Sequence, residues 1–288
     1  MKDRERHIDI MGIVNLTDDS YFEESRCGTD PRQMVRKALS VIEEMLEDGA
    51  TIIDLGACST RPGSVPVGAE EEWRRLRPVL KALATRCPEV RISIDTYHSS
   101  VIRSAFDLLS DILGQEWTRR SLMVNDISSG EDDDAMLPLV AELGLVYMAM
   151  HKRGDSRTMQ SLCDYEDVTA QVKAYFDEFA LKAKACGIKE WILDPGFGFA
   201  KTLEQNYTLL RDLDVFSACG TEEGGQRRIL VGVSRKSMIY KFLGISPDTA
   251  LPATQVLHLK ALQNGADILR VHDVAEAART VSLYRILG

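Results

Sequence analysis

The chain has 288 residues, of which 44% are hydrophobic and 27% are charged, proportions that are ordinary for a soluble globular protein. Its 35 Lys and Arg residues are outnumbered by 44 Asp and Glu residues, so the formal net charge is −9. This balance disfavours a general electrostatic surface for nucleic acid or anionic lipid, and any anion must be captured by a local site.

The sequence contains no sign of a targeting or membrane segment. Its six cysteines are scattered without a CxxC pair, and the N-terminus leads directly into a strand pattern instead of an apolar signal segment. No apolar run approaches the roughly 20 residues that span a bilayer. We therefore expect a cytoplasmic protein that binds neither membrane nor nucleic acid.

Short apolar runs alternate with helical patterns along the chain. The runs, which are typical of buried parallel strands, are Ile8–Val14, Thr51–Leu55, Arg91–Ile94, Ser121–Val124, Leu145–Met150, Glu190–Leu193, Ile229–Val233 and Asp267–Val271. The helical patterns that follow them are Pro31–Asp48, Glu70–Ala84, Ser99–Leu109, Ala135–Leu143, Asp167–Ala185, Leu203–Leu213, Pro252–Gln263 and Val274–Ile286. This alternation predicts an α/β fold, a single (β/α)8 TIM barrel over residues 1–288 with eight parallel strands. Its active site is expected at the C-terminal ends of the strands.

The first two predicted strands end in polar loops. Asn15 opens a loop, Thr17–Phe22, that we interpret either as a mobile flap with an aromatic tip or as an ordinary connection. After the second strand, Ser59–Gly63 places two hydroxyls beside the Arg61 guanidinium, a combination suited to phosphate oxygens. The alternative for this segment is a simple turn.

Asp95 and Asp194 each follow a hydrophobic strand directly, where a carboxylate is costly unless something donates hydrogen bonds to it. The two adjacent N–H groups of an amino-pyrimidine edge match the two oxygens of a carboxylate. Asn125 offers both a donor and an acceptor to such a ring. The alternative is that each group only ties a neighbouring strand in place, but three such groups at strand ends favour a flat heterocyclic ligand.

Positive charge gathers after the last two strands, where barrels often bind phosphate. Ser234–Ser237 contains Arg235 and Lys236, and Arg270–His272 closes the eighth strand, so we expect an anion site here. No HExxH, GxSxG or GxxxxGK[ST] motif supports zinc, a nucleophilic serine or a nucleoside triphosphate. Of the strand-end histidines, His272 is the expected anion ligand, whereas His151 is expected to be structural or supporting.

Several strand-end strings together resemble dihydropteroate synthases, in that family's order and over nearly the whole chain. They are Met11–Thr17, Asp54–Gly63, Ile94–Thr96, Val124–Ile127, Asp194–Phe199, Gly232–Ser237 and Arg270–Asp273. The resemblance implies a pterin-binding barrel that joins 4-aminobenzoate to 6-hydroxymethyl-7,8-dihydropterin diphosphate and releases diphosphate in folate biosynthesis. It also implies a homodimer built through helices near the C-terminal half.

The resemblance assigns roles to individual positions. It implies that the pterin is held by Asp95, Asn125, Asp194 and Lys236, with Asp95, Lys236 and Arg270 as the catalytic residues. It implies a diphosphate site formed by Asn15, Thr60, Arg61, Arg270 and His272, with Asn15 placing Mg²⁺ on the diphosphate, and a 4-aminobenzoate pocket that includes Tyr21 and Ser237. Loss of Asp194 is predicted to abolish pterin binding, and loss of Arg270 to weaken chiefly the binding of diphosphate.

The chemistry expected of such a site is a dissociative substitution, in which the electron-rich ring delocalises the cation left when diphosphate departs. The sequence departs from the family pattern at Asp18, Tyr21 and Cys58, which bears on rate and inhibitor response more than on reaction class. Two alternatives are a pterin-dependent methyltransferase that serves a corrinoid partner, and a non-catalytic relative that binds pterin. The methyltransferase would not need the cationic groups after the seventh and eighth strands.

Overall fold

A computed structural model describes residues 6–16, 31–58, 67–154, 158–222 and 225–287. Within these ranges the strands are β1 (Asp9–Asn15), β2 (Ile52–Gly56), β3 (Arg91–Asp95), β4 (Leu122–Asp126), β5 (Val146–Met150), β6 (Trp191–Asp194), β7 (Leu230–Val231) and β8 (Ile268–Val271). The helices are α1 (Pro31–Glu47), α2 (Ala69–Arg86), α3 (Ser99–Leu113), α4 (Gln115–Ser121), α5 (Met136–Leu143), α6 (Val168–Cys186), α7 (Leu203–Arg211), α8 (Ser237–Leu243), α9 (Leu251–Gln263) and α10 (Val274–Leu287).

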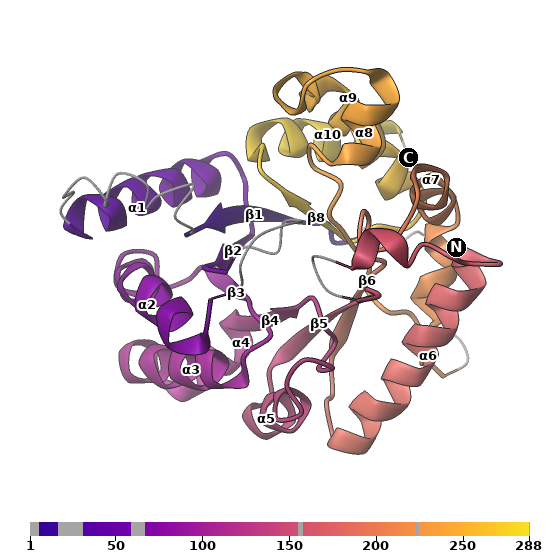
Figure 1. The fold of residues 1–288 in the computed structure, drawn as a ribbon. Helices are drawn as coiled ribbons and strands as arrows, with labels where there is room; N and C mark the ends of the chain where they lie inside the picture. Colours follow the sequence, from indigo (N-terminus) through magenta and orange to yellow (C-terminus); the bar gives the residue numbers. More distant parts are fainter. Residues whose placement is uncertain (1–5, 17–30, 59–66, 155–157, 223–224, 288) are drawn as a thin grey trace.

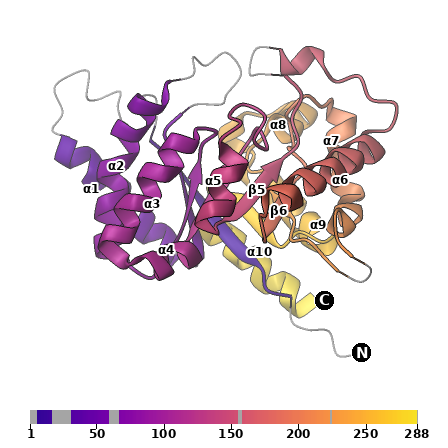
Figure 2. The same cartoon turned by 90° about the horizontal axis from the view of Figure 1, so that it is seen from below.

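These strands form a parallel barrel with the helices around it, as Figures 1 and 2 show from two directions. The hydrogen-bonded order is β6-β5-β4-β3-β2-β1-β8-β7, and every strand pair in it is parallel. A parallel bridge between Leu193 and Ile229 joins β6 to the residue before β7 and completes the circle. The predicted TIM barrel is confirmed.

The strand register sorts the inward-facing side chains into layers, because neighbours in register point to the same side of a sheet. A middle layer of fully or almost fully buried apolar side chains fills the barrel: Met11, Ile52, Met123, Met148, Ile192, Leu230 and Ile268. Two residues further along four of these strands, the inward positions are polar: Asp54, Asn125, Asp194 and Arg270. The candidate site therefore lies directly on the C-terminal side of this apolar layer.

The structure differs from the predicted elements in three places. Residues 110–120, for which the sequence suggested no role, complete α3 and then form most of α4, whose last residue is Ser121. The seventh connection contains α8 before α9, and β7 is shorter than the run Ile229–Val233. No helix in the described ranges is both long and apolar enough to cross a membrane.

Candidate active site

One row of polar residues crosses four neighbouring strands at their C-terminal ends. Asn15 pairs with Gly56, Gly56 with Asp95, and Asp95 with Asn125. Gly56 contributes no side chain, and a methyl group at that position would lie 3.6 Å from Asp95 Oδ2 and 3.7 Å from Asn15 Oδ1. The amide of Asn15 and the carboxylate of Asp95 therefore face the same space above Gly56. This confirms that residues far apart in the sequence share one end of the barrel.

Arg270 reaches into this row from β8 and joins two carboxylates. Its Nε donates to Asp54 Oδ2 at 2.7 Å, and its Nη2 donates to Asp95 Oδ2 at 2.5 Å. Asn125 Nδ2 donates to the same Asp54 oxygen at 3.2 Å. Asp54 is fully buried in the middle of β2 and was not among the expected site residues. It holds Arg270 and Asn125 in place from below.

The charges of this network depend on one another. Burial raises the pKa of Asp95, and the guanidinium of Arg270 opposes that rise. Burial also works against the charge of Arg270, but the carboxylates of Asp54 and Asp95 outweigh it and raise the pKa of Arg270. The guanidinium therefore stays charged at the barrel mouth, where 22% of its side chain is exposed and can meet an anion.

Asp194 and Lys236 form the second part of the site, at the ends of β6 and β7. Asp194 is 7% exposed, and its Oδ1 accepts a hydrogen bond from the backbone of Gly196 at 2.8 Å. Burial raises the pKa of Asp194, whereas the nearby Lys236 lowers it. Lys236 Nζ donates to the carbonyl oxygen of Phe197 at 2.5 Å and lies 5.0 Å from the centre of the Phe199 ring. A carboxylate and a cation beside an aromatic side chain thus lie at this part of the barrel mouth.

The cationic residues after β7 and β8 divide into two kinds. Arg235 is committed to Asp273, with Nε to Oδ2 at 2.8 Å and Nη2 to Oδ1 at 2.7 Å, so this bidentate pair ties the two loops together. His272 is exposed, and its Nδ1 lies 3.1 Å from Ser234 Oγ. Ser237 begins α8 and is half-buried. Arg235 therefore links two loops, whereas Arg270 pairs with carboxylates of the polar row at the barrel mouth.

Part of the expected site lies outside the described residues. Thr60 and Arg61 of the diphosphate site, Tyr21 of the aminobenzoate pocket and the departure at Asp18 all fall there. Cys58 is described and is half-buried next to this segment; burial raises the pKa of its thiol. That shift disfavours the reactive thiolate form.

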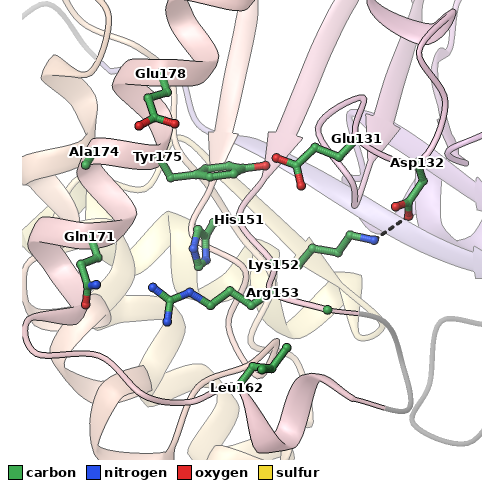
Figure 3. A pocket seen from close by; sticks show the side chains of 11 residues that line it. Glu131, Asp132, His151, Lys152, Arg153, Leu162, Gln171, Ala174, Tyr175 and Glu178 are labelled. Atoms are coloured by element: carbon green, nitrogen blue, oxygen red, sulfur yellow. Dashed lines mark hydrogen bonds and ion pairs between the residues drawn. The ribbon is translucent and has the colours of Figure 1, made fainter.

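A separate cavity of about 770 Å³ lies outside the barrel mouth, between α6 and the loops that follow β4 and β5. Figure 3 shows Arg153, Tyr175 and Glu131 around it, with His151 at its inner side. Lys152 pairs with Asp132 here at 2.5 Å. The cavity contains none of Asp95, Asn125, Asp194, Lys236 and Arg270, so it is distinct from the candidate active site.

Comparison with known proteins agrees with this geometry. The family model described as "Pterin binding enzyme" matches residues 11–272. The chain belongs to the pterin-binding enzyme family. It is 39% identical over 283 residues to the dihydropteroate synthase of Escherichia coli K12, covering 98% of this chain and 91% of that relative. It is 37% identical over 273 residues to that of Synechocystis, covering 94% and 86%.

Solved structures of this pterin-binding family have the same fold. A dihydropteroate synthase from Clostridium difficile, determined in the presence of pteroic acid, superposes with a TM-score of 0.84 at 33% identity, covering 100% of this chain and 99% of that one. One from Xanthomonas albilineans, determined with 4-aminobenzoic acid, gives a TM-score of 0.83 at 32% identity, covering 98% and 93%.

Two buried residues contact the candidate site but were missed by sequence reasoning. Asp54 lies within an apolar run and not at a strand end. It is two residues from Ile52, so both side chains point into the barrel, and this spacing is the signal that could have identified it. Lys201 is 4% exposed behind the Asp194 loop. A lysine in a loop is usually exposed, so the sequence alone does not show that Lys201 is buried.

Proposed function

We propose that this chain is a dihydropteroate synthase. It transfers the pterinylmethyl group of 6-hydroxymethyl-7,8-dihydropterin diphosphate to the amino nitrogen of 4-aminobenzoate, and releases diphosphate, in folate biosynthesis. The observation that carries the proposal is the meeting of Asp95, Asn125 and Asp194 with Lys236 and Arg270 at one end of the barrel. The 39% identity to a dihydropteroate synthase over almost the full chain supports it further.

Recognition of the pterin falls to the buried carboxylates. Asp194 has one oxygen on the Gly196 amide, and its carboxylate is suited to accept from the amino-pyrimidine edge of the ring. Asn125 and Asp95 face the ring from β4 and β3, and Lys236 supplies a donor from the opposite side. A pterin ring bound among these residues donates hydrogen bonds to carboxylates that would otherwise be costly to bury.

The reaction is a dissociative substitution at the exocyclic methylene carbon. The bond between this carbon and the diphosphate oxygen breaks, and the electron pair leaves with diphosphate. The dihydropterin ring delocalises the resulting cation, which the buried carboxylates favour electrostatically. The lone pair of the 4-aminobenzoate nitrogen forms the new C–N bond, and the nitrogen then loses a proton to solvent. No strong base is needed, because the arylamine nitrogen is acidic once it is alkylated.

Arg270 and Lys236 stabilise the charge of the departing diphosphate. Arg270 is held in position by Asp54 and Asp95, so little reorganisation is required when negative charge develops. His272 is exposed at the same mouth and is suited to a diphosphate oxygen, and Thr60 and Arg61 are assigned to the same anion by the family pattern. Ser237 and Tyr21 are assigned to the 4-aminobenzoate pocket on the same basis.

The donor set also fits Mg²⁺ bound together with diphosphate. Among the described residues no group of three or more His, Cys, Asp or Glu side chains forms a metal cage. Magnesium usually binds through one or two protein oxygens plus substrate phosphates and water, and Asn15 Oδ1 offers such an oxygen beside Asp95. When bound, the ion would neutralise charge on the leaving group.

Exposed apolar side chains near the C-terminus support a homodimer. Val256 on α9 is 66% exposed and Ile286 on α10 is 81% exposed, with Phe242, Leu243, Leu283 and Leu287 also exposed on α8 and α10. Helices α9 and α10 pack against each other, and exposed apolar side chains on adjoining helices are typical of protein–protein interfaces. Light scattering is expected to give twice the chain mass for the wild type and the single mass for Val256→Asp. A monomeric wild type would contradict this part of the proposal.

The activity is tested by diphosphate release from the purified chain. We expect release only when the pterin diphosphate, 4-aminobenzoate and Mg²⁺ are all present, with dihydropteroate formed in equal amount. Release that is independent of 4-aminobenzoate would contradict the proposal. Pterin binding without release would favour the non-catalytic alternative, and methyl transfer to a corrinoid would favour the methyltransferase.

A further inference from the structure

Lys201 is a buried cation at the back of the site. Its Nζ donates to the carbonyl oxygens of Gly196 and Phe199, each at 2.9 Å, and lies 3.0 Å from His151 Nδ1. Among the described residues, no carboxylate accepts a hydrogen bond from Lys201. An ammonium held in this way is costly to bury, and burial lowers the pKa of Lys201 to about 7. We therefore looked to the contacts of Lys201 for a role that offsets the cost of burying its ammonium group.

The loop that Lys201 fastens has a left-handed backbone at three positions. Gly196, Gly198 and Ala200 have φ values of +70°, +85° and +50°, and alanine rarely adopts this region. A methyl group at Gly196 would lie 2.0 Å from the carbonyl oxygen of His151. The loop is therefore pressed against the end of β5, and Lys201 bonds to both sides of that contact.

The same loop positions the groups that meet the pterin. The Gly196 amide donates to Asp194, and the Phe197 carbonyl accepts from Lys236. The Phe199 ring lies beside the Lys236 ammonium. A shift of the loop would therefore displace both the Gly196 amide that binds Asp194 and the Phe197 carbonyl that binds Lys236.

His151 completes the anchor from β5. Its backbone amide donates to the carbonyl oxygen of Asp194 at 3.0 Å, and its ring packs edge-on against Tyr175 at 4.9 Å, at the inner side of the cavity in Figure 3. Burial lowers the pKa of His151 to about 2, so the ring is neutral and its Nδ1 can accept from Lys201. The His151 ring is thus held between Lys201 and Tyr175.

We propose that Lys201 is a positioning residue for pterin binding, acting through the Gly196–Ala200 loop that it ties to His151. This inference rests on the proposed function, because it concerns the pterin site of that enzyme. Lys201 touches no substrate; it sets the place of the Phe197 carbonyl and the Gly196 amide, and through them of Lys236 and Asp194.

The test is Lys201→Met in the full chain, with 6-hydroxymethylpterin as the calorimetric probe. We expect an affinity about tenfold weaker than that of the wild type, the size of effect typical of small displacements in a binding site. The KM for 4-aminobenzoate should stay within about twofold, and amide hydrogen exchange should accelerate in the peptide that covers 194–201. Tyr147→Phe is the matched control, because it removes a buried hydrogen bond to Asp126 without touching the loop. It should lower stability and leave pterin affinity unchanged.

Three outcomes would overturn the inference. Folded Lys201→Met that binds the pterin like the wild type would contradict it and leave the proposed function intact, whereas a wild type that binds no pterin would contradict both. If Lys201→Met does not fold, His151→Phe is the second variant, because it removes the Nδ1 acceptor of Lys201 and keeps an aromatic ring against Tyr175. We expect His151→Phe to weaken pterin binding by about threefold, consistent with one lost indirect contact, and unchanged affinity would overturn the inference.

Discussion

At the scale of single residues, the site works through charges whose burial is offset by specific partners. Arg270 keeps its charge because Asp54 and Asp95 lie at 2.7 Å and 2.5 Å. Lys236 has no such carboxylate at hydrogen-bonding distance among the described residues, and its Nζ bonds to a carbonyl instead. Burial lowers the pKa of Lys236 to about 8, and Asp194 only partly restores it. Burial thus brings the pKa of Lys236 to about 8 and that of Lys201 to about 7, and of these two lysines Lys236 is the one assigned to the substrate.

We predict an alkaline limit to activity set by Lys236. The groups that act on it are Asp194 and Asp95, which raise its pKa, and Arg270, which lowers it. The charged form prevails below about pH 8, so kcat/KM for the pterin diphosphate should fall as pH rises through about 8. In Lys236→Arg, whose side chain stays charged, the fall should move to higher pH whatever the overall rate. Lys152→Met changes a lysine outside the site, so its kcat/KM should fall at the same pH as that of the wild type. If kcat/KM of Lys236→Arg also falls at the wild-type pH, Lys236 does not set the alkaline limit.

At the scale of elements, strand register decides which residues meet. The apolar runs identified all eight strands, because buried parallel strands need continuous hydrophobic sequence. The short helices α4 and α8 were missed, because seven residues are too few to show a helical period. Strand-end chemistry correctly placed Asp95 and Asn125 together, but the commitment of Arg235 to Asp273 depends on a contact between residues 38 apart in sequence. The sequence around Arg235 does not show that its partner is Asp273.

The loop after β6 offers an element-scale prediction. Gly196 and Gly144 have nearly equal φ values, +70° and +68°, but a methyl group meets His151 O at 2.0 Å at the first and nothing within 4 Å at the second. Gly144→Ala should therefore cost only the backbone strain, about 1 kcal/mol of unfolding free energy. Gly196→Ala should cost clearly more and weaken pterin binding as well. Urea unfolding and pterin titration check this, and equal losses in the two variants would contradict the close contact.

At the scale of the whole molecule, the barrel separates stability from function along its axis. Below the apolar layer, the fully buried Asp9 of β1 binds Arg228 at 2.6 Å and also Arg91. Burial alone would raise the pKa of Asp9, but the hydrogen bonds from these two arginines outweigh it and lower the pKa to about 2. Above the apolar layer, carboxylates and cations face the mouth. The same residue types thus hold the barrel together at one end and meet ligand at the other.

The lower end yields a prediction about stability and pH. Because the pKa of Asp9 is lowered from 3.8 to about 2, its contribution is fully present above pH 3.8 and is lost as pH falls through about 2. At pH 7, Asp9→Asn should lower the unfolding free energy by about 2 kcal/mol. The difference from the wild type should narrow between pH 4 and pH 2 in denaturant titrations. A difference that stays constant over this range would show that the ionised form of Asp9 is not what stabilises the barrel.

The most direct test compares the two ends of the barrel in one measurement, the calorimetric titration of the wild type, Asp194→Asn and Asp9→Asn with 6-hydroxymethylpterin. We expect Asp194→Asn to bind about a hundredfold more weakly, as the loss of hydrogen bonds to a buried carboxylate implies. Asp9→Asn should bind like the wild type in spite of its lower stability. Pterin affinity that survives in Asp194→Asn, or that falls equally in both variants, would contradict the assignment of the upper carboxylates to the pterin.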